Sequence, residues 1–162
     1  MVPPHQKGTA SMYARVASLP DLDKIFAAPA QRCIEELESA GSSLGEAERN
    51  FRTRQRVGDI RALIIKDDDA TGLISWQKRE VLGSLRIRVY FIGVEEFFAP
   101  QVPSTRFGRK YMRTLQSELG NLPMLSMCWG THPEVDRWYR LMGYRLAETY
   151  GQQRNFVLEP RQ

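Results

Sequence analysis

Four basic side chains stand close together in one segment, where they could hold a phosphate group. They fall within the first turn and a half of a helix predicted from about Ser104 to Leu119, and they are Arg106, Arg109, Lys110 and Arg113. Guanidinium groups match the geometry of phosphate oxygens, and helix N-termini attract anions. The same spacing is typical of the solvated face of an amphipathic helix. Both interpretations stay open at this point.

Residue types used in nucleophilic and metal chemistry are sparse. His132 stands at a predicted helix start with no cysteine or acid at triad spacing, so it is interpreted as a residue of the cap region. Cys33 and Cys128 each lie in an apolar run without a metal-ligand neighbour, which indicates buried thiols in a reducing compartment. No metal site is expected.

Length and charge indicate one ordinary domain. The chain has 162 residues, and its 23 Lys and Arg against 19 Asp and Glu give a net charge of +4. This mild excess permits a weak nucleic-acid contact but does not require one. No apolar run approaches the roughly 20 residues that span a bilayer. We expect a flexible arm over residues 1–11 and a single domain over residues 12–162. The first residues do not resemble a signal peptide, so a cytosolic location is expected.

The stretch from Met124 to Tyr144 gives the clearest structural pattern. Met124 to Trp129 is apolar apart from one serine and too short for a helix, which indicates a strand buried on both faces. Thr131 and Glu134 form a T-x-x-E capping box, which predicts the start of a helix. Gly143 predicts its end.

The other expected elements follow from the same kinds of signal. They are a strand over Met12 to Ala17, a helix from the Ser18 cap to Gly41 broken or kinked at Pro29, a helix from Leu44 to about Val57 capped by Ser43, a hairpin of Ile60 to Lys66 with Gly72 to Lys78, a strand over Leu85 to Val94, and final strands over Tyr144 to Tyr150 and Asn155 to Glu159. A helix separates Leu85–Val94 from Met124–Trp129. Parallel neighbours require such a crossover, so these two strands are predicted to lie side by side and parallel.

The order of these elements is that of the GNAT superfamily of N-acetyltransferases, and the last third resembles it most. There the helix typically ends in a Phe-Tyr-x-x-x-Gly-Phe phrase, which here is Trp138-Tyr139-Arg140-Leu141-Met142-Gly143-Tyr144. The resemblance implies an α/β (α+β) fold with a GNAT-like mixed, mostly antiparallel sheet and helices on both faces. An aromatic stripe of this kind is also typical of plain core packing.

The resemblance also implies where acetyl-CoA would bind. In GNAT enzymes an Arg/Gln-x-x-Gly-x-Gly/Ala loop lets backbone amides at a helix start cradle the pyrophosphate. With Arg106 in the first position, the two small positions hold Arg109 and Tyr111, and Gly108 is one residue out of place. The cofactor-binding candidates, if acetyl-CoA binds, are therefore Arg106, Gly108, Arg109 and Lys110. Because two bulky residues stand where a phosphate oxygen would lie, no cofactor is expected.

Two catalytic candidates come from the same resemblance, and they apply only if the chain is an enzyme. Tyr139 falls where many GNAT enzymes keep a tyrosine that returns a proton to the departing CoA thiolate. Glu95, beside Glu96, falls where a general base is sometimes found. Tyr139 also suits simple packing, because it lies four residues after Val135 on one helix face.

A narrower group resembles the chain over about 130 residues: the acetyltransferase-like proteins of tailed bacteriophages, often described as internal virion proteins. The matching segments are Cys33 to Ala47 (CIEELESAGSSLGEA), Gly72 to Trp76, Ile92 to Glu95, and LSMCWGTHPEVDRWYRLMGY near the end. In the last of these, Arg137, Trp138 and Gly143 match. The family's Asn and His do not, and His132 and Val135 stand in their place.

That resemblance implies a virion component which works through protein contacts without acetyl transfer. Its partners would be other virion proteins near the portal or core, and a weak nucleic-acid contact would be secondary. It would be located in the virion and, during assembly, in the host cytoplasm. The arm 1–11 and the arginine-rich helix from Leu44 to Val57 are the expected contact surfaces. The alternative is an acetyl-CoA-dependent N-acetyltransferase with a degenerate phosphate loop.

Overall fold

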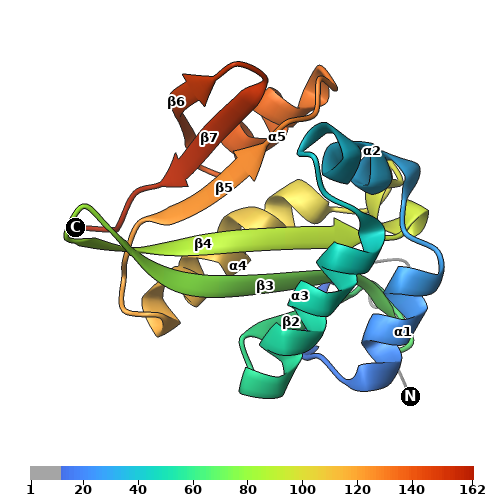
Figure 1. Cartoon of the computed structure of the whole chain (residues 1–162). Coiled ribbons are helices and arrows are strands. Elements are labelled where there is room, and N and C mark those ends of the chain that lie inside the picture. The colour runs from blue at the N-terminus through green and yellow to red at the C-terminus, as the bar shows by residue number, and fades with distance from the viewer. Residues whose placement is uncertain (1–11) are drawn as a thin grey trace.

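The computed structural model describes residues 12–162, which form one seven-stranded sheet with helices on both faces (Figure 1). The strands are β1 (Tyr13–Val16), β2 (Ile60–Ile64), β3 (Ala70–Val81), β4 (Ser84–Gly93), β5 (Met124–Cys128), β6 (Arg145–Tyr150) and β7 (Gln153–Leu158). The helices are α1 (Leu19–Ala27), α2 (Gln31–Ser39), α3 (Leu44–Val57), α4 (Ser104–Glu118) and α5 (Glu134–Leu141), with a 3-10 helix at Glu95–Phe98. The predicted arm, residues 1–11, lies outside the described residues.

The sheet has the strand order β1-β2-β3-β4-β5-β7-β6. Every neighbouring pair is antiparallel except β4 and β5, which are parallel. The fold class predicted from the sequence, a mixed and mostly antiparallel sheet, is therefore confirmed. So is the parallel pairing of the strand at Leu85–Val94 with the strand at Met124–Trp129, although β5 ends one residue earlier, at Cys128.

Local signals fix the first three helices. The chain breaks between α1 and α2 around Pro29, as predicted from the proline. Ser43 caps α3, because its side-chain oxygen accepts a hydrogen bond from the amide of Glu46 at 3.2 Å. The helix ends where Gly58 takes a left-handed conformation with φ 81°. The bounds predicted for α3 are confirmed.

The predicted capping box of Thr131 with Glu134 is wrong. The helix α5 begins at Glu134 with Pro133 as its N-cap, and Pro133 has no side-chain oxygen that could cap it. Pro133 already has helical dihedral angles, with φ −64°, so the first turn of the helix starts there, and Thr131 lies too far before it to act as the N-cap. The nearby His132 ring nitrogen Nδ1 accepts the Glu134 amide at 3.3 Å, which confirms His132 as a residue of the cap region.

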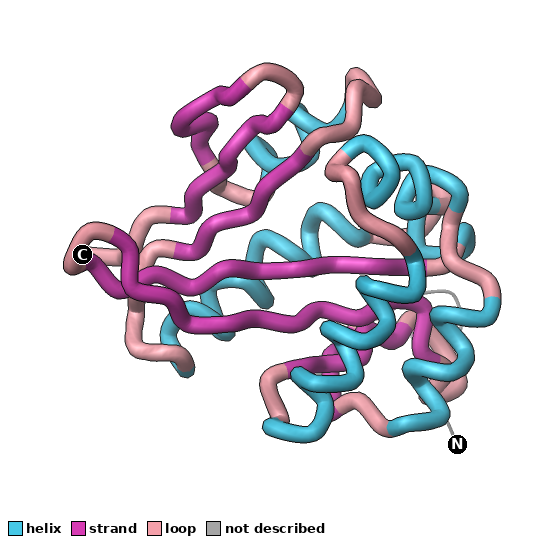
Figure 2. Tube along the Cα trace, viewed as in Figure 1, coloured by secondary structure: helices cyan, strands magenta, loops and turns pink. Residues whose placement is uncertain are grey.

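Two apolar clusters lie on opposite faces of the sheet, and Figure 2 shows the helices that lie along the strands. The helices α1 and α3 pack on one face through Leu22, Ile25 and Phe51. The helices α4 and α5 cover the other, where Leu115 and Phe156 are fully buried. Each face is covered by its own helices, and the ends of the central strands lie open between them as one place for a site.

Replacing Phe156 by alanine should lower the free energy of unfolding by about 3–5 kcal/mol, since a fully buried ring leaves a cavity. The ring also stacks on Tyr139 at 4.4 Å between centroids. Denaturant unfolding measures the change. Tyr150→Ala is the control, because Tyr150 is 64% exposed and its loss should change stability by less than about 0.5 kcal/mol. Equal midpoints for the two variants would contradict the packing described.

An ion pair ties the edge strand β1 to α1. The guanidinium of Arg15 donates to both carboxylate oxygens of Asp21, at 2.6 and 3.0 Å. The backbone amide and hydroxyl of Ser18 also donate to Asp21, at 2.7 and 2.9 Å. Burial alone raises the pKa of Asp21, but the hydrogen bonds from Arg15 and Ser18 outweigh it and hold the pKa below its usual range.

Asp21→Asn should therefore destabilise the protein at neutral pH by about 1–3 kcal/mol. Because the pKa of Asp21 is lower in the folded state, the carboxylate contributes its full stabilisation above the unfolded pKa of about 3.9, and this stabilisation is lost as the pH falls through the folded pKa. The difference in free energy of unfolding between wild type and variant should therefore disappear in acid, as measured by denaturant unfolding across pH. Asp23→Asn is the control, since that carboxylate is exposed. A gap that is constant with pH would exclude an ionic origin.

Candidate functional site

The crevice between the ends of β4 and β5 is the candidate site. These strands pair in parallel through only two residue pairs, Ile87 with Met124 and Arg88 with Leu125, and then diverge. In open α/β sheets, ligands bind at the carboxyl ends of parallel strands where the neighbouring connections part. The helices α4 and α5 border this crevice on one side of the sheet, and α2 approaches the end of β5 on the other.

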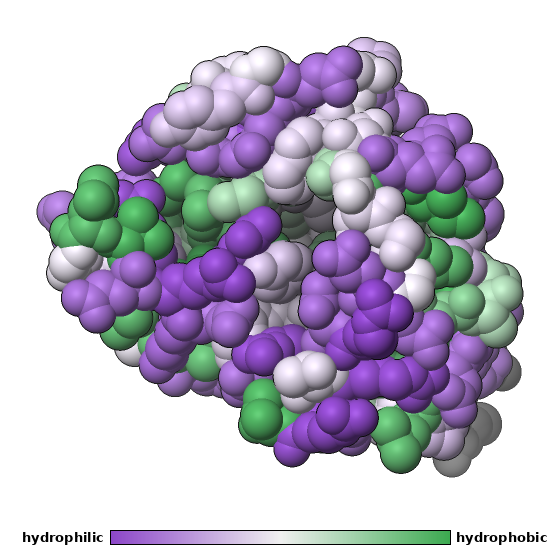
Figure 3. Space-filling view, viewed as in Figure 1, coloured by the Kyte–Doolittle hydropathy of each residue, from purple (hydrophilic) through white to green (hydrophobic). Residues whose placement is uncertain are grey.

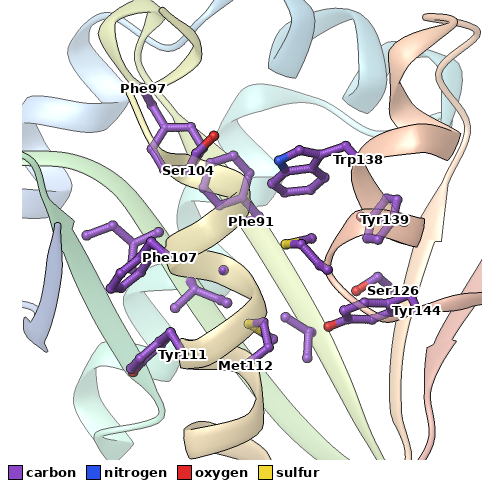
Figure 4. A pocket seen from close by; sticks show the side chains of 15 residues that line it. Phe91, Phe97, Ser104, Phe107, Tyr111, Met112, Ser126, Trp138, Tyr139 and Tyr144 are labelled. Carbon is purple, nitrogen blue, oxygen red and sulfur yellow. The ribbon is translucent and has the colours of Figure 1, made fainter. Parts of the chain in front are cut away.

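The chain's own side chains fill most of the crevice. A cavity of about 50 Å³ remains, lined almost entirely by apolar and aromatic residues from β4, α4, β5 and α5 (Figure 4). Phe91 of β4 and Trp138 of α5 approach from opposite walls, with ring centroids 6.4 Å apart. Phe91 also packs on Phe97 at 4.8 Å and Phe98 at 6.0 Å. Ligand sites usually enclose roughly 300–1,000 Å³, so this space suits a few waters and no larger molecule.

Tyr139, the first catalytic candidate, lines this cavity beside Ser126 (Figure 4). Burial strongly raises the pKa of Tyr139; the neighbouring Cys128 and Tyr144 raise it further, and Ser126 only partly offsets them. A general acid works best when its pKa lies near the working pH. The surroundings of Tyr139 move it away from that condition, and its stacking on Phe156 shows a packing role.

Glu95, the second catalytic candidate, serves as a cap for α2. Its side-chain oxygen Oε1 accepts the backbone amide of Gln31, the first residue of α2, at 2.8 Å. The residue is exposed in the 3-10 helix and does not line the cavity. The structure thus does not bring Glu95 and Tyr139 together around one small space. Glu96, beside it, is exposed as well.

The predicted phosphate-binding residues divide into two groups. Arg106, Arg109 and Lys110 are exposed on α4, and none of them forms an ion pair within residues 12–162. Arg113 is turned towards the C-terminal strand, where its guanidinium donates to the carbonyl of Glu159 at 2.6 Å. Guanidinium groups near the helix start are therefore present, but they point outwards rather than into the crevice.

Gly108 faces the next helix. A Cβ atom added at Gly108 would lie 2.5 Å from Sδ of Met142, so the missing side chain is what lets α4 approach α5. Tyr111, at one of the two small positions of the GNAT loop, stacks on Phe107 with centroids 5.3 Å apart, and burial raises its pKa to about 12. The residues present do not fit acetyl-CoA: the glycine's space is taken by Met142, and the crevice is closed by aromatic rings.

On the opposite side of the crevice, α2 is bound to the end of β5. A carboxylate oxygen of Glu36 accepts the amide of Trp129 at 2.5 Å, and the other lies 3.9 Å from Sγ of Cys128. Gly130 leaves room for this carboxylate, since an added Cβ would lie 2.5 Å from it. Arg154 of β7 donates to the Gly130 carbonyl at 2.8 Å. Burial, and next Glu36, raise the pKa of the Cys128 thiol, which keeps it protonated and a poor nucleophile.

The sequence analysis missed Glu36, although a signal was present. Glu36 follows Cys33 by three residues and so shares the inner side of α2 with Leu37, which makes it a charged residue on an apolar face. Phe91 was placed in a buried strand, but nothing in its spacing showed that it would meet Trp138. Within residues 12–162, no group of three or more His, Cys, Asp or Glu side chains could hold a metal ion. None of the helices described is long and apolar enough to cross a membrane.

Comparison with solved structures identifies the fold. A GNAT-family acetyltransferase from Listeria monocytogenes superposes with a TM-score of 0.65 at 15% identity, covering 93% of this chain and 95% of that one. The yncA acetyltransferase from Salmonella typhimurium, with its cofactor acetyl-CoA, gives 0.59 at 14% identity over 93% and 94%. An N-acetyltransferase from Staphylococcus aureus gives 0.62 at 12% identity over 92% and 98%. The chain thus has the fold of the GNAT acetyltransferases. No family model and no curated protein sequence matches it.

The contact between Gly108 and Met142 can be tested by a double-mutant cycle. Gly108→Ala in the wild type should lower stability by about 1 kcal/mol or more, because the clash outweighs the gain of roughly 1 kcal/mol from replacing glycine in a helix. In a Met142→Ala background the same change should be neutral or stabilising. Denaturant unfolding of the four proteins measures the coupling. Stabilisation by Gly108→Ala in the wild type would show that α5 moves away freely.

Proposed function

We propose that this protein is an acetyltransferase-like component of a tailed-bacteriophage virion, which acts through protein contacts and transfers no acetyl group. The observation that carries the proposal is the filled crevice between β4 and β5. Phe91, Trp138 and Met142 occupy the space that a cofactor would need, and about 50 Å³ is left. A protein selected to bind a large nucleotide there would gain nothing from closing it.

The segments that resemble phage proteins support the virion part of the proposal. Glu36 lies in the segment Cys33–Ala47, and it binds the amide of Trp129 in the closing segment. Gly130, in the same closing segment, provides the space for its carboxylate. Two of the matching segments are therefore joined by one contact, which gives a physical reason for their occurring together.

The contact surfaces proposed are residues 1–11 and the outer side of α3. On α3 the guanidinium of Arg52 already pairs with Asp23 at 2.7 Å and Glu48 at 2.8 Å, so it is engaged within the chain. Arg49 and Arg56 are exposed and form no ion pair within residues 12–162. Arginine is enriched in protein interfaces, so these two side chains are the better candidates for contacts with other virion proteins.

An N-acetyltransferase is the second candidate, and one observation favours it. Tyr139 lines the cavity together with Ser126, and the GNAT resemblance gives this residue the role of protonating a leaving thiolate. For this function the rings of Phe91 and Trp138 would have to move apart before acetyl-CoA could enter.

Calorimetric titration with acetyl-CoA separates the two candidates. We expect no binding at millimolar concentrations, because the crevice is filled, and therefore no change in melting temperature. A ligand that did bind would raise the melting temperature, since at about a hundred times its Kd it stabilises the native state by about 2.7 kcal/mol. Micromolar affinity that is lost in Arg106→Ala and kept in the control Arg56→Ala would reject the proposal and establish the enzyme.

Mass spectrometry of purified phage particles tests the location. We expect this protein in intact virions at a fixed ratio to the other internal proteins. Absence from virions, together with abundance in the cytosol of infected cells, would exclude a structural role.

A further inference from the structure

A second pocket lies on the opposite face of the sheet from the cavity at Tyr139. It has a volume of about 120 Å³ and is formed by α3 and the middle of β3 and β4. Its lining is polar throughout: Asn50, Thr53, Arg54, Gln77, Arg79 and Tyr90. Strongly hydrophilic side chains cover the region where α3 lies beside these strands (Figure 3). Room for one water needs roughly 10–15 Å³ on this scale, so the pocket can hold a group with several oxygen atoms.

Two guanidinium groups line this pocket, and two more stand at neighbouring positions on the same face of the sheet. Arg54 and Arg79 line it directly. On β4, Arg86 is the cross-strand partner of Arg79, and Arg88 is the partner of Gln77, so both project from the same face. Like charges directly opposite each other destabilise a sheet. None of the four arginines forms an ion pair within residues 12–162. The repulsion is therefore not balanced by a carboxylate of the described chain.

One donor in this cluster is buried without a partner. The Nε atom of Arg86 is shielded from solvent and makes no hydrogen bond in residues 12–162. Buried donors are almost always satisfied, so this one needs an explanation, and an ion or water bound beside the pocket supplies one. The neighbouring groups are held in place. Arg79 donates from Nε and from one terminal nitrogen to Oε1 of Gln77, at 3.2 and 3.1 Å, and the guanidinium of Arg88 lies over the Tyr90 ring at 5.1 Å.

We infer that this pocket binds a phosphate group. Positive charge from Arg54 and Arg79 meets neutral donors from Asn50, Thr53, Gln77 and Tyr90 around a space of several oxygens. Arg86 and Arg88 add positive charge on the same face of the sheet. A carboxylate carries one negative charge in a plane, whereas a phosphate carries up to two and presents its oxygens in a tetrahedron. Guanidinium forks arriving from the helix α3 and from the strand β3 match the tetrahedral arrangement better.

The inference is independent of the proposed function. The pocket lies on the α3 face, whereas the start of α4 and the cavity at Tyr139 lie on the other, so neither conclusion needs the other. The phosphate can come from the backbone of a nucleic acid or from a free phosphorylated compound. Both sources present the same group to the pocket, and the experiment separates them.

Thermal unfolding with sodium pyrophosphate, against sodium chloride at the same ionic strength, tests the site. The melting temperature of the wild type should rise with pyrophosphate alone. Arg54→Gln and Arg79→Gln should abolish the rise, and by calorimetry each should weaken pyrophosphate binding by roughly tenfold or more, the loss of one charge-assisted contact. In phosphate-free buffer Arg79→Gln should melt no lower than wild type, because it removes the repulsion with Arg86.

Two variants serve as matched controls. Arg49→Gln, on the exposed side of α3, and Arg137→Gln, on the exposed side of α5, should keep the full response to pyrophosphate. Absence of a wild-type response beyond that in chloride would overturn the inference. So would a response that persists in both pocket variants, or equal stabilisation by an acidic peptide such as polyglutamate.

A short single-stranded oligonucleotide identifies the source of the phosphate. If nucleic acid supplies it, the oligonucleotide binds more tightly than pyrophosphate, and Arg79→Gln reduces the slope of log affinity against log salt by about 0.7. If a free compound supplies it, the oligonucleotide binds no more tightly than pyrophosphate. Either result supports the site, provided that the pocket variants lose binding.

Discussion

The parallel pairing of β4 with β5 stops after two residue pairs, and much of the molecule depends on where it stops. Continued pairing would have closed the sheet between these two strands. Divergence instead opens a wedge in the middle of the domain, with apolar walls that cannot be left in contact with water without cost. Something must fill the wedge. In this chain aromatic side chains do so, from β4 and the 3-10 helix on one side and from α5 on the other.

The filling of the wedge also fixes the helices around it. Met142 occupies the space that a side chain at residue 108 would take, so α4 and α5 approach closely. On the other side, Glu36 holds α2 against the end of β5, because its carboxylate accepts a backbone hydrogen bond there in the space left by Gly130. Each of the two glycines is thus needed for packing. A glycine near the start of α4 would otherwise be taken as the remnant of a phosphate loop.

Charge is distributed unequally between the two faces of the sheet. On α4, Arg106, Arg109 and Lys110 are spread over an exposed helix side, where water screens them. On the α3 face, Arg79 and Arg86 stand opposite each other on neighbouring strands, and within residues 12–162 one Arg86 nitrogen is buried without a partner. A cluster of the second kind stores repulsion that a bound anion relieves. The mild net charge of +4 gives no hint of this concentration.

Local signals in the sequence determined most of the fold. Ser43 and Gly58 bounded α3, Pro29 divided the first helices, and the apolar run from Met124 gave the central strand, because caps, breaks and burial patterns act within a few residues. The N-cap of α5 was misjudged by two residues, Thr131 instead of Pro133, since proline geometry overrode the capping pattern at Thr131. The order of the elements was enough to predict a parallel pair at β4 and β5, because a helical crossover forces it.

Only the tertiary structure decided what surrounds each candidate residue. Periodicity shows that Tyr139 faces inwards, but not that its hydroxyl would be enclosed with Ser126 and Cys128. Alternation along β4 shows that Arg86 and Arg88 share a face, but the register that sets Arg79 opposite Arg86 comes from the turn between the strands. Contacts such as Phe91 with Trp138 join residues 47 positions apart. Sequence patterns report the secondary structure of each segment, whereas the approach of distant segments depends on packing of the whole domain.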